Sequence, residues 1–185
     1  MLYLSIFTGF FIVGSSKIYA MQFIPDEKFL GLVASLGGLF GAMRFTWSMA
    51  YDRFSFRKVY GSLLLCQIIC CFSLPVILEY VESMRVKKVF YSLVVFICFW
   101  CEGGHFTLAP TVFKKLFGLR GGIRVWAVGY SFSGMASITL VFIDNFLLDK
   151  VGFKIVSQAI GCLSIVSLVL LVVFFKETRV MSDLS

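Results

Sequence analysis

The chain has 185 residues, of which 59% are hydrophobic and 17% are aromatic, and its formal net charge is +7. This hydrophobic content is well above that of soluble globular domains, which excludes a soluble domain and favours a protein of the lipid bilayer. The positive charges stand between long apolar runs and not in a polar domain, so they indicate membrane topology and exclude nucleic acid as a partner.

Six apolar segments are each long enough to cross the hydrocarbon core of a membrane, for which about 20 apolar residues are needed. In chain order they cover residues 2–23, 29–50, 59–79, 89–110, 124–146 and 152–175. The connections are short and charged, which leaves no room for a soluble domain. The sequence therefore predicts an all-α polytopic membrane protein in which residues 1–185 form one six-span transmembrane domain.

Lysine and arginine residues between the spans predict the topology, because cytoplasmic loops are enriched in them. With six spans, both termini lie on the same side. That side carries nine of these residues: Arg53, Arg57, Lys58, Lys114, Lys115, Arg120, Arg124, Lys176 and Arg179. The opposite side carries six: Lys28, Arg85, Lys87, Lys88, Lys150 and Lys154. We therefore expect both termini on the cytoplasmic side of the membrane. The sequence does not identify which membrane this is.

Four ionisable residues fall inside predicted spans: Lys17, Arg44, Glu102 and Asp144. A charged side chain at the centre of a membrane helix costs about 2.5–3.5 kcal/mol on insertion scales, so it usually has a partner or a function. The alternative interpretation is that Lys17 and Arg44 extend to the nearer interface and that Asp144 sits at an outer helix end.

Arg44 and Glu102 are expected at similar depths. At 1.5 Å per residue, Arg44 is about 22 Å along its span and Glu102 about 20 Å along its own, and these two spans run in the same direction. Gly37 and Gly41 share a helical face with Arg44, which forms a stripe of small residues that lets another helix or water approach. We therefore expect Arg44 and Glu102 to be neighbours around a polar cavity.

The single histidine, His105, follows Glu102 by three residues, so the two side chains share a helical face. A carboxylate beside an imidazole can relay protons, whereas a hydrogen-bonded structural histidine is the alternative. Cys98 and Cys101 have metal-ligand spacing relative to His105, but the sequence contains no second ligand pair. We therefore expect no metal and no cofactor.

Two stretches resemble motifs of the major facilitator superfamily of transporters. The stretch SMAYDRFSFRK resembles its cytoplasmic loop motif, through Ser48, Asp52, Arg53, Arg57 and Lys58. The stretch CEGGHFTLAPTVFKKLFGLRGG resembles the junction of the tenth and eleventh spans in the branch of oxalate-formate antiporters and monocarboxylate transporters, through Gly103, Gly104, Phe106, Pro110, Phe117 and Gly118. The stretches AVGYSFSGMAS and DKVGFK also resemble that branch, so the similarity covers essentially the whole chain.

The resemblance implies that the six spans are spans seven to twelve, the C-terminal half of a twelve-span alternating-access carrier. The expected partners are then the lipid bilayer, a small-molecule solute, and either a missing N-terminal six-span half or a second copy of the chain. The loop motif implies a cytoplasmic gate at Asp52, Arg53 and Arg57.

In that fold the spans that carry Lys17, Arg44, Glu102 and His105 line the central cavity, which makes these four the expected substrate-binding residues. The matching arginine of this branch contacts the substrate carboxylate, a role that the resemblance gives to Arg44. Relatives of the oxalate type carry a lysine in the eleventh span, whereas residues 124–146 have none in their core, so the kind of carboxylate stays open.

The expected function is transmembrane transport of a small solute, an organic anion such as a carboxylate, and not an enzymatic activity. The alternative is a non-transporting six-span interaction or regulatory protein, or an inactive transporter fragment. An intramembrane serine protease is disfavoured, because Ser131 and Ser133 lack the Gly-x-Ser-Gly context and follow His105 in the chain.

Overall fold

The computed structural model describes residues 1–175, and every regular element among them is a helix. In chain order the helices are α1 (Leu2–Ala20), α2 (Glu27–Ala42), α3 (Phe45–Arg53), α4 (Phe56–Tyr80), α5 (Met84–Phe146), α6 (Leu148–Val151) and α7 (Phe153–Phe174). The predicted all-α class is confirmed for this part of the chain. Lys176 and Arg179, which entered the topology prediction, lie outside the described residues.

Five helical stretches of the described chain are long and apolar enough to cross a membrane, which indicates a membrane-embedded protein. Four are α1, α4, α5 and α7, and the fifth, Glu27–Arg53, joins α2 and α3. The expected count of six is not confirmed, because the predicted spans 89–110 and 124–146 both belong to α5, which has 63 residues.

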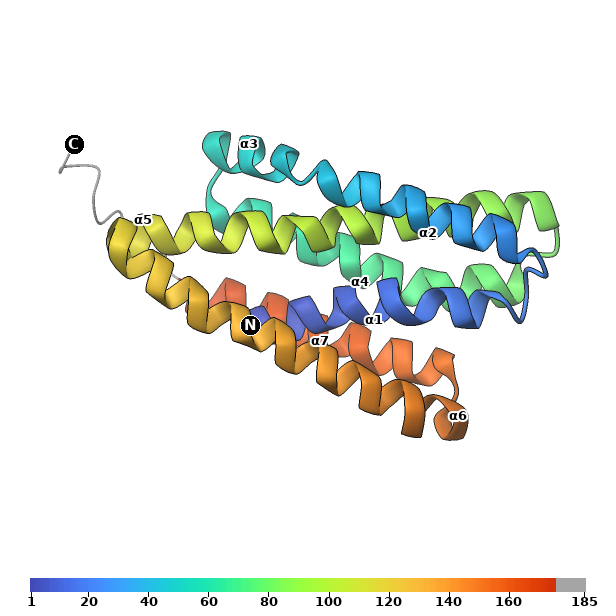
Figure 1. Cartoon of the computed structure of the whole chain (residues 1–185). Coiled ribbons are helices and arrows are strands. Elements are labelled where there is room, and N and C mark those ends of the chain that lie inside the picture. Colours follow the sequence, from blue (N-terminus) through green and yellow to red (C-terminus); the bar gives the residue numbers. More distant parts are fainter. Residues whose placement is uncertain (176–185) are drawn as a thin grey trace.

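α5 turns back on itself at Gly118. A straight helix of its length would measure about 95 Å, roughly three times the thickness of the hydrocarbon core. Gly118 has φ 71° and ψ 171°, a non-helical conformation that glycine adopts without the steric cost of a Cβ. Figure 1 shows the first limb running from green to yellow and the second returning from yellow to orange. A single glycine thus makes the turn between the predicted spans 89–110 and 124–146.

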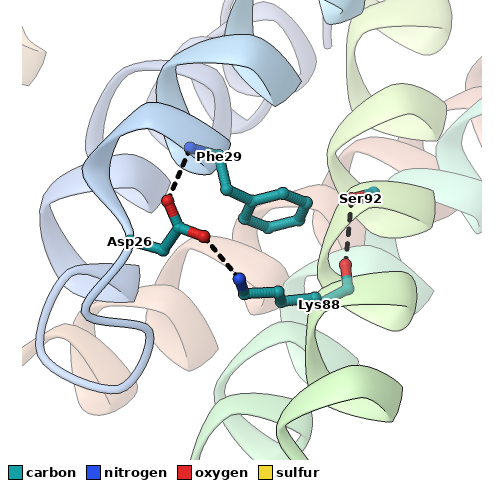
Figure 2. Close-up of polar contacts among 4 residues, drawn as sticks. All are labelled: Asp26, Phe29, Lys88 and Ser92. Atoms are coloured by element: carbon teal, nitrogen blue, oxygen red, sulfur yellow. Dashed lines mark hydrogen bonds and ion pairs between the residues drawn. The ribbon is translucent and has the colours of Figure 1, made fainter.

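Asp26 fixes the turn between α1 and α2 and ties it to α5. One carboxylate oxygen accepts a hydrogen bond from the Phe29 backbone N–H at 3.0 Å, which caps α2, and the other binds Nζ of Lys88 at 2.5 Å (Figure 2). The pKa of the Asp26 carboxyl lies below its usual value, first because Lys88 donates to it and then because Phe29 does. This ion pair holds the start of α2 beside the start of α5.

Glycines set the distance between α2 and α5. A Cβ on Gly103 would lie 2.5 Å from the backbone oxygen of Gly41, and a Cβ on Gly37 would lie 2.5 Å from the ring of Phe99. The stripe of small residues expected on α2 therefore forms a close helix contact. α5 also packs against α1 and α4, and α7 packs against both of these helices, which encloses the interior of the bundle.

Candidate functional site

Five polar side chains from three helices lie in the interior of the bundle, and we call them the buried polar cluster. They are Ser5 on α1, Tyr60 and Gln67 on α4, and Glu102 and His105 on α5. Glu102 is 8% exposed and the other four are 0% exposed. Because burying a polar group is costly unless it is hydrogen-bonded, the bonds within the cluster determine what each member can do.

His105 is at the centre of a hydrogen-bonded chain. Its Nε2 lies 3.1 Å from Oε1 of Gln67, and its Nδ1 lies 3.0 Å from the hydroxyl of Tyr60. An amide oxygen can only accept, so these partners assign the proton to Nε2 and leave Nδ1 of a neutral ring to accept from Tyr60. The Tyr60 hydroxyl is also 2.8 Å from Oγ of Ser5. With both nitrogens engaged, His105 has the contacts of a structural histidine.

Glu102 differs from its neighbours because neither carboxyl oxygen has a hydrogen-bond partner among the described residues. Its side chain extends from α5 toward α1 and occupies the space that a Cβ on Gly9 would need. Nε2 of Gln67 lies 3.0 Å from the same Cβ position on Gly9, and it also has no hydrogen-bond partner among the described residues. A buried carboxyl group and an amide donor therefore lie close together with unused bonding capacity.

Arg44 lies at the junction of α2 and α3 and its side chain is exposed. Its Cβ is 3.0 Å from the position that a Cβ on Gly103 would take, so its backbone is close to α5. The expected contact between Arg44 and Glu102 is nevertheless absent from the described ion pairs. Successive helical residues point about 100° apart, so Gly103 faces α2 while Glu102 faces α1.

Lys17 and Asp144 lie away from the cluster. Lys17 is half-buried in the last turn of α1, eight residues beyond Gly9, which corresponds to about 12 Å along the helix. Asp144 lies near the end of α5 and accepts a hydrogen bond of 2.7 Å from Oγ of Ser15. Asp144 and Ser15 line a cavity of about 500 Å³ together with Glu79 and Lys154, which form an ion pair. The structure thus brings together only Glu102 and His105 of the four expected substrate-binding residues.

The three expected gate residues lie at the connection of α3 to α4. Asp52 and Arg53 are exposed at the end of α3. Arg57, in the first turn of α4, donates a hydrogen bond of 2.6 Å to the backbone oxygen of Val172 on α7. Arg57 therefore joins α4 to the last turn of α7, at the end of the bundle where the α3–α4 connection lies.

Two alternative chemistries lack the required geometry among the described residues. Ser131 and Ser133 donate to the carbonyl oxygens of Val128 and Tyr130 in their own helix, and neither is a partner of His105, so no serine–histidine pair is formed. No group of three or more histidine, cysteine, aspartate or glutamate side chains in the described chain is placed to share a metal ion.

Tyr60 and Gln67 were not among the residues expected at the site. Gln67 interrupts the apolar run GSLLLCQIICC, and a polar amide within a span is a signal that could have identified it. Tyr60 falls near the predicted start of its span, where tyrosine commonly marks a membrane interface, so its sequence position gave no such signal.

Comparisons with protein families, with curated proteins and with solved structures find no match to this chain.

Proposed function

We propose that this chain is one six-span half of an alternating-access carrier of the major facilitator type, and that the carrier moves a small organic anion such as a carboxylate. If the two limbs of α5 cross the membrane separately, the five apolar stretches provide six crossings. Both ends of the chain then lie on one side, which the lysine and arginine distribution assigns to the cytoplasm.

The exposure of Arg44 is the observation that carries this proposal. Arg44 belongs to the apolar stretch Glu27–Arg53, yet its side chain is exposed and has no ion-pair partner among the described residues. An arginine that faced hydrocarbon there would cost at least about 2.5 kcal/mol, so its surroundings should be polar. A guanidinium in a polar cavity can hold a carboxylate through two parallel hydrogen bonds, which favours an organic anion as the solute.

A carrier of this type also needs a second bundle, because alternating access requires one bundle to rock against another around a central site. The partner is either an N-terminal six-span half or a second copy of this chain. In either assembly the exposed side chain of Arg44 would line the space between the two bundles, where it does not contact lipid.

Uptake of radiolabelled carboxylates tests the proposal. Membrane vesicles from cells that express the chain should accumulate formate, lactate or oxalate in a saturable manner, and Arg44→Ala should reduce uptake by about tenfold or more, which corresponds to a lost interaction of at least about 1.4 kcal/mol. Arg85→Ala is the matched control, since Arg85 is an exposed arginine at the start of α5, and it should transport normally.

Absence of saturable carboxylate uptake by vesicles that contain the correctly inserted chain together with its partner bundle would reject the carrier. Full uptake by Arg44→Ala would retain a carrier and reject Arg44 as the residue that binds the anion. If uptake is absent and the protein tolerates the replacement of both Arg44 and Glu102 by apolar residues, a non-transporting interaction protein becomes the better explanation.

A further inference from the structure

Glu102 has bonding capacity that the described chain does not use. It is 8% exposed, and Oε1 and Oε2 both lack a hydrogen-bond partner. An ionised carboxylate that is buried without a partner is strongly unfavourable, so the group is either neutralised by a bound cation or carries a proton.

The elements packed around Glu102 provide no cation that could neutralise it. Its titratable neighbours are Cys101 and His105 on α5 and Tyr60 on α4, none of which is a permanent cation. α1 contributes Gly9 at the contact, and the titratable residues of α1 on either side, Tyr3 and Lys17, are six and eight residues away, or about 9 and 12 Å along the helix.

The other neighbouring helices give the same result. At the junction of α2 and α3, the side chain of Arg44 is exposed, and its Cβ lies beside Gly103, on the face of α5 that contacts α2. On α7, Lys154 is paired with Glu79 and Cys162 is exposed. Glu102 is therefore not neutralised by any charged side chain that the structure describes.

A proton fits this position better than a metal ion does. Hard cations bind many oxygen ligands: Ca²⁺ takes about six to eight and Mg²⁺ takes about six. Glu102 offers only two free oxygens. The nearby oxygens of Gln67 and Tyr60 are already bonded to His105. A protonated carboxyl group, by contrast, is uncharged and needs no such coordination.

We propose that Glu102 is a proton-binding site, which holds a proton on one carboxyl oxygen in this conformation and releases it when the contact between α1 and α5 opens to water. Release breaks one O–H bond, transfers the proton to water and leaves a carboxylate, with no change in oxidation state. We assign Gln67 the role of a positioning residue: its Oε1 is bonded to His105, and its free Nε2–H group, which lies beside the same Gly9 contact, would donate to the carboxylate once the proton has left. This inference deepens the proposed function by naming the proton as the coupled ion, and it rests on that function for its role in transport alone.

Infrared spectroscopy of the full chain in lipid vesicles tests the site without a transport assay. At about neutral pH, where free carboxyl groups are ionised, the wild type should show the C=O stretching band of a protonated carboxylic acid. Glu102→Gln should lose that band, whereas Glu27→Gln, which changes an exposed glutamate at the start of α2, should keep it.

Gly9→Ala provides a second variant that retains the acid. Its Cβ collides with the Glu102 carboxyl, so the band should shift in frequency or decrease. Gly31→Ala is the matched control, because a Cβ at Gly31 meets nothing within 4 Å, and it should leave the band unchanged.

A wild-type spectrum without a carboxylic-acid band at neutral pH overturns the inference, and this measurement requires no variant to fold. A band that persists unchanged in Glu102→Gln overturns it as well. Carboxylate uptake is measured separately. A Glu102 band without any uptake by the chain assembled with its partner bundle retains the proton site and rejects the carrier. Uptake without a Glu102 band retains the carrier and rejects the proton site.

Discussion

Arg44 and Glu102 lie at the same helix crossing but face different sides of α5. The Cβ of Arg44 packs beside Gly103, on the face of α5 that contacts α2, whereas the Glu102 carboxyl extends to Gly9 on α1. The cation is exposed on the surface of the bundle and the acid is buried within it. This arrangement gives the two groups separate roles in our proposals, since Arg44 can meet a solute while Glu102 can hold a proton.

Gly103→Ala should destabilise the protein, because the new Cβ would lie 2.5 Å from the backbone oxygen of Gly41 and force α2 away from α5. We expect a loss of about 1–3 kcal/mol, the usual cost of overpacking, visible as a lower unfolding temperature in detergent followed by circular dichroism. Gly38→Ala is the control, since nothing lies within 4 Å of its Cβ position. Equal stability of the two variants would show that the α2–α5 contact is looser than described.

Tyr60→Phe should also destabilise the protein, through the interior of the bundle. It removes the hydroxyl that bonds both Nδ1 of His105 and Oγ of Ser5, and it leaves a buried imidazole nitrogen without a partner. The expected loss is about 1–3 kcal/mol by denaturant or thermal unfolding. Tyr130→Phe, at an exposed tyrosine, should have little effect. If Tyr60→Phe is as stable as the wild type, the hydrogen-bonded chain through His105 does not support the fold.

The helical class could be predicted because hydropathy and segment length determine it directly. Apolar segments of about 20 residues leave a helix as the main structure that satisfies the backbone in lipid. The extent of each helix was harder to predict. The sequence indicated a connection around Gly118, yet a chain reversal needs only one residue with positive φ, so helix continues on both sides and joins two predicted spans.

The site could be predicted only where residues belong to one helix. The shared face of Glu102 and His105 follows from their spacing of three, whereas Tyr60 and Gln67 reach His105 through the packing of α4 on α5. The expected pairing of Arg44 with Glu102 rested on depth alone. Depth fixes the position along a helix but not the direction of a side chain, and Glu102 and Gly103, adjacent in the chain, face different helices.

The Asp26–Lys88 ion pair should make stability depend on pH. Because the folded state lowers the pKa of Asp26, this carboxyl contributes stability above its unfolded pKa of about 3.9, and the contribution is lost as pH falls through the lower folded value. The wild type should therefore unfold at a higher temperature than Asp26→Asn near neutral pH, and the difference should shrink as the pH falls below about 4. The measurement is a pair of thermal unfolding series across that range.

Two comparisons make the Asp26 prediction specific. Lys88→Met removes the other partner and should give a similarly reduced dependence on pH, and added salt should weaken the effect in the wild type because the pair is partly exposed. A constant difference between the wild type and Asp26→Asn over the whole pH range would mean that the backbone cap, and not the charge, is what the substitution changes.

Each limb of α5 should cross the membrane, so that the turn at Gly118 lies on one side and the start and end of α5 lie on the other. Single cysteines at Met84, Leu119 and Leu147 sample the start, the turn and the end of α5, and all three positions are exposed. With the other cysteines replaced, a membrane-impermeant maleimide added to intact cells should label Met84→Cys and Leu147→Cys. It should label Leu119→Cys only after the cells are permeabilised, because the topology prediction places the turn at Gly118 in the cytoplasm.

The labelling pattern separates the possible topologies. The reverse pattern, with only Leu119→Cys labelled from outside, would keep six crossings and place the termini outside the cytoplasm. Labelling of all three positions from the same side would mean that neither limb of α5 crosses the membrane. That result would contradict the six-span half-bundle on which the carrier proposal depends. If instead the two ends of α5 are labelled from outside and its turn is not, each limb of α5 crosses the membrane and the five apolar stretches make six crossings.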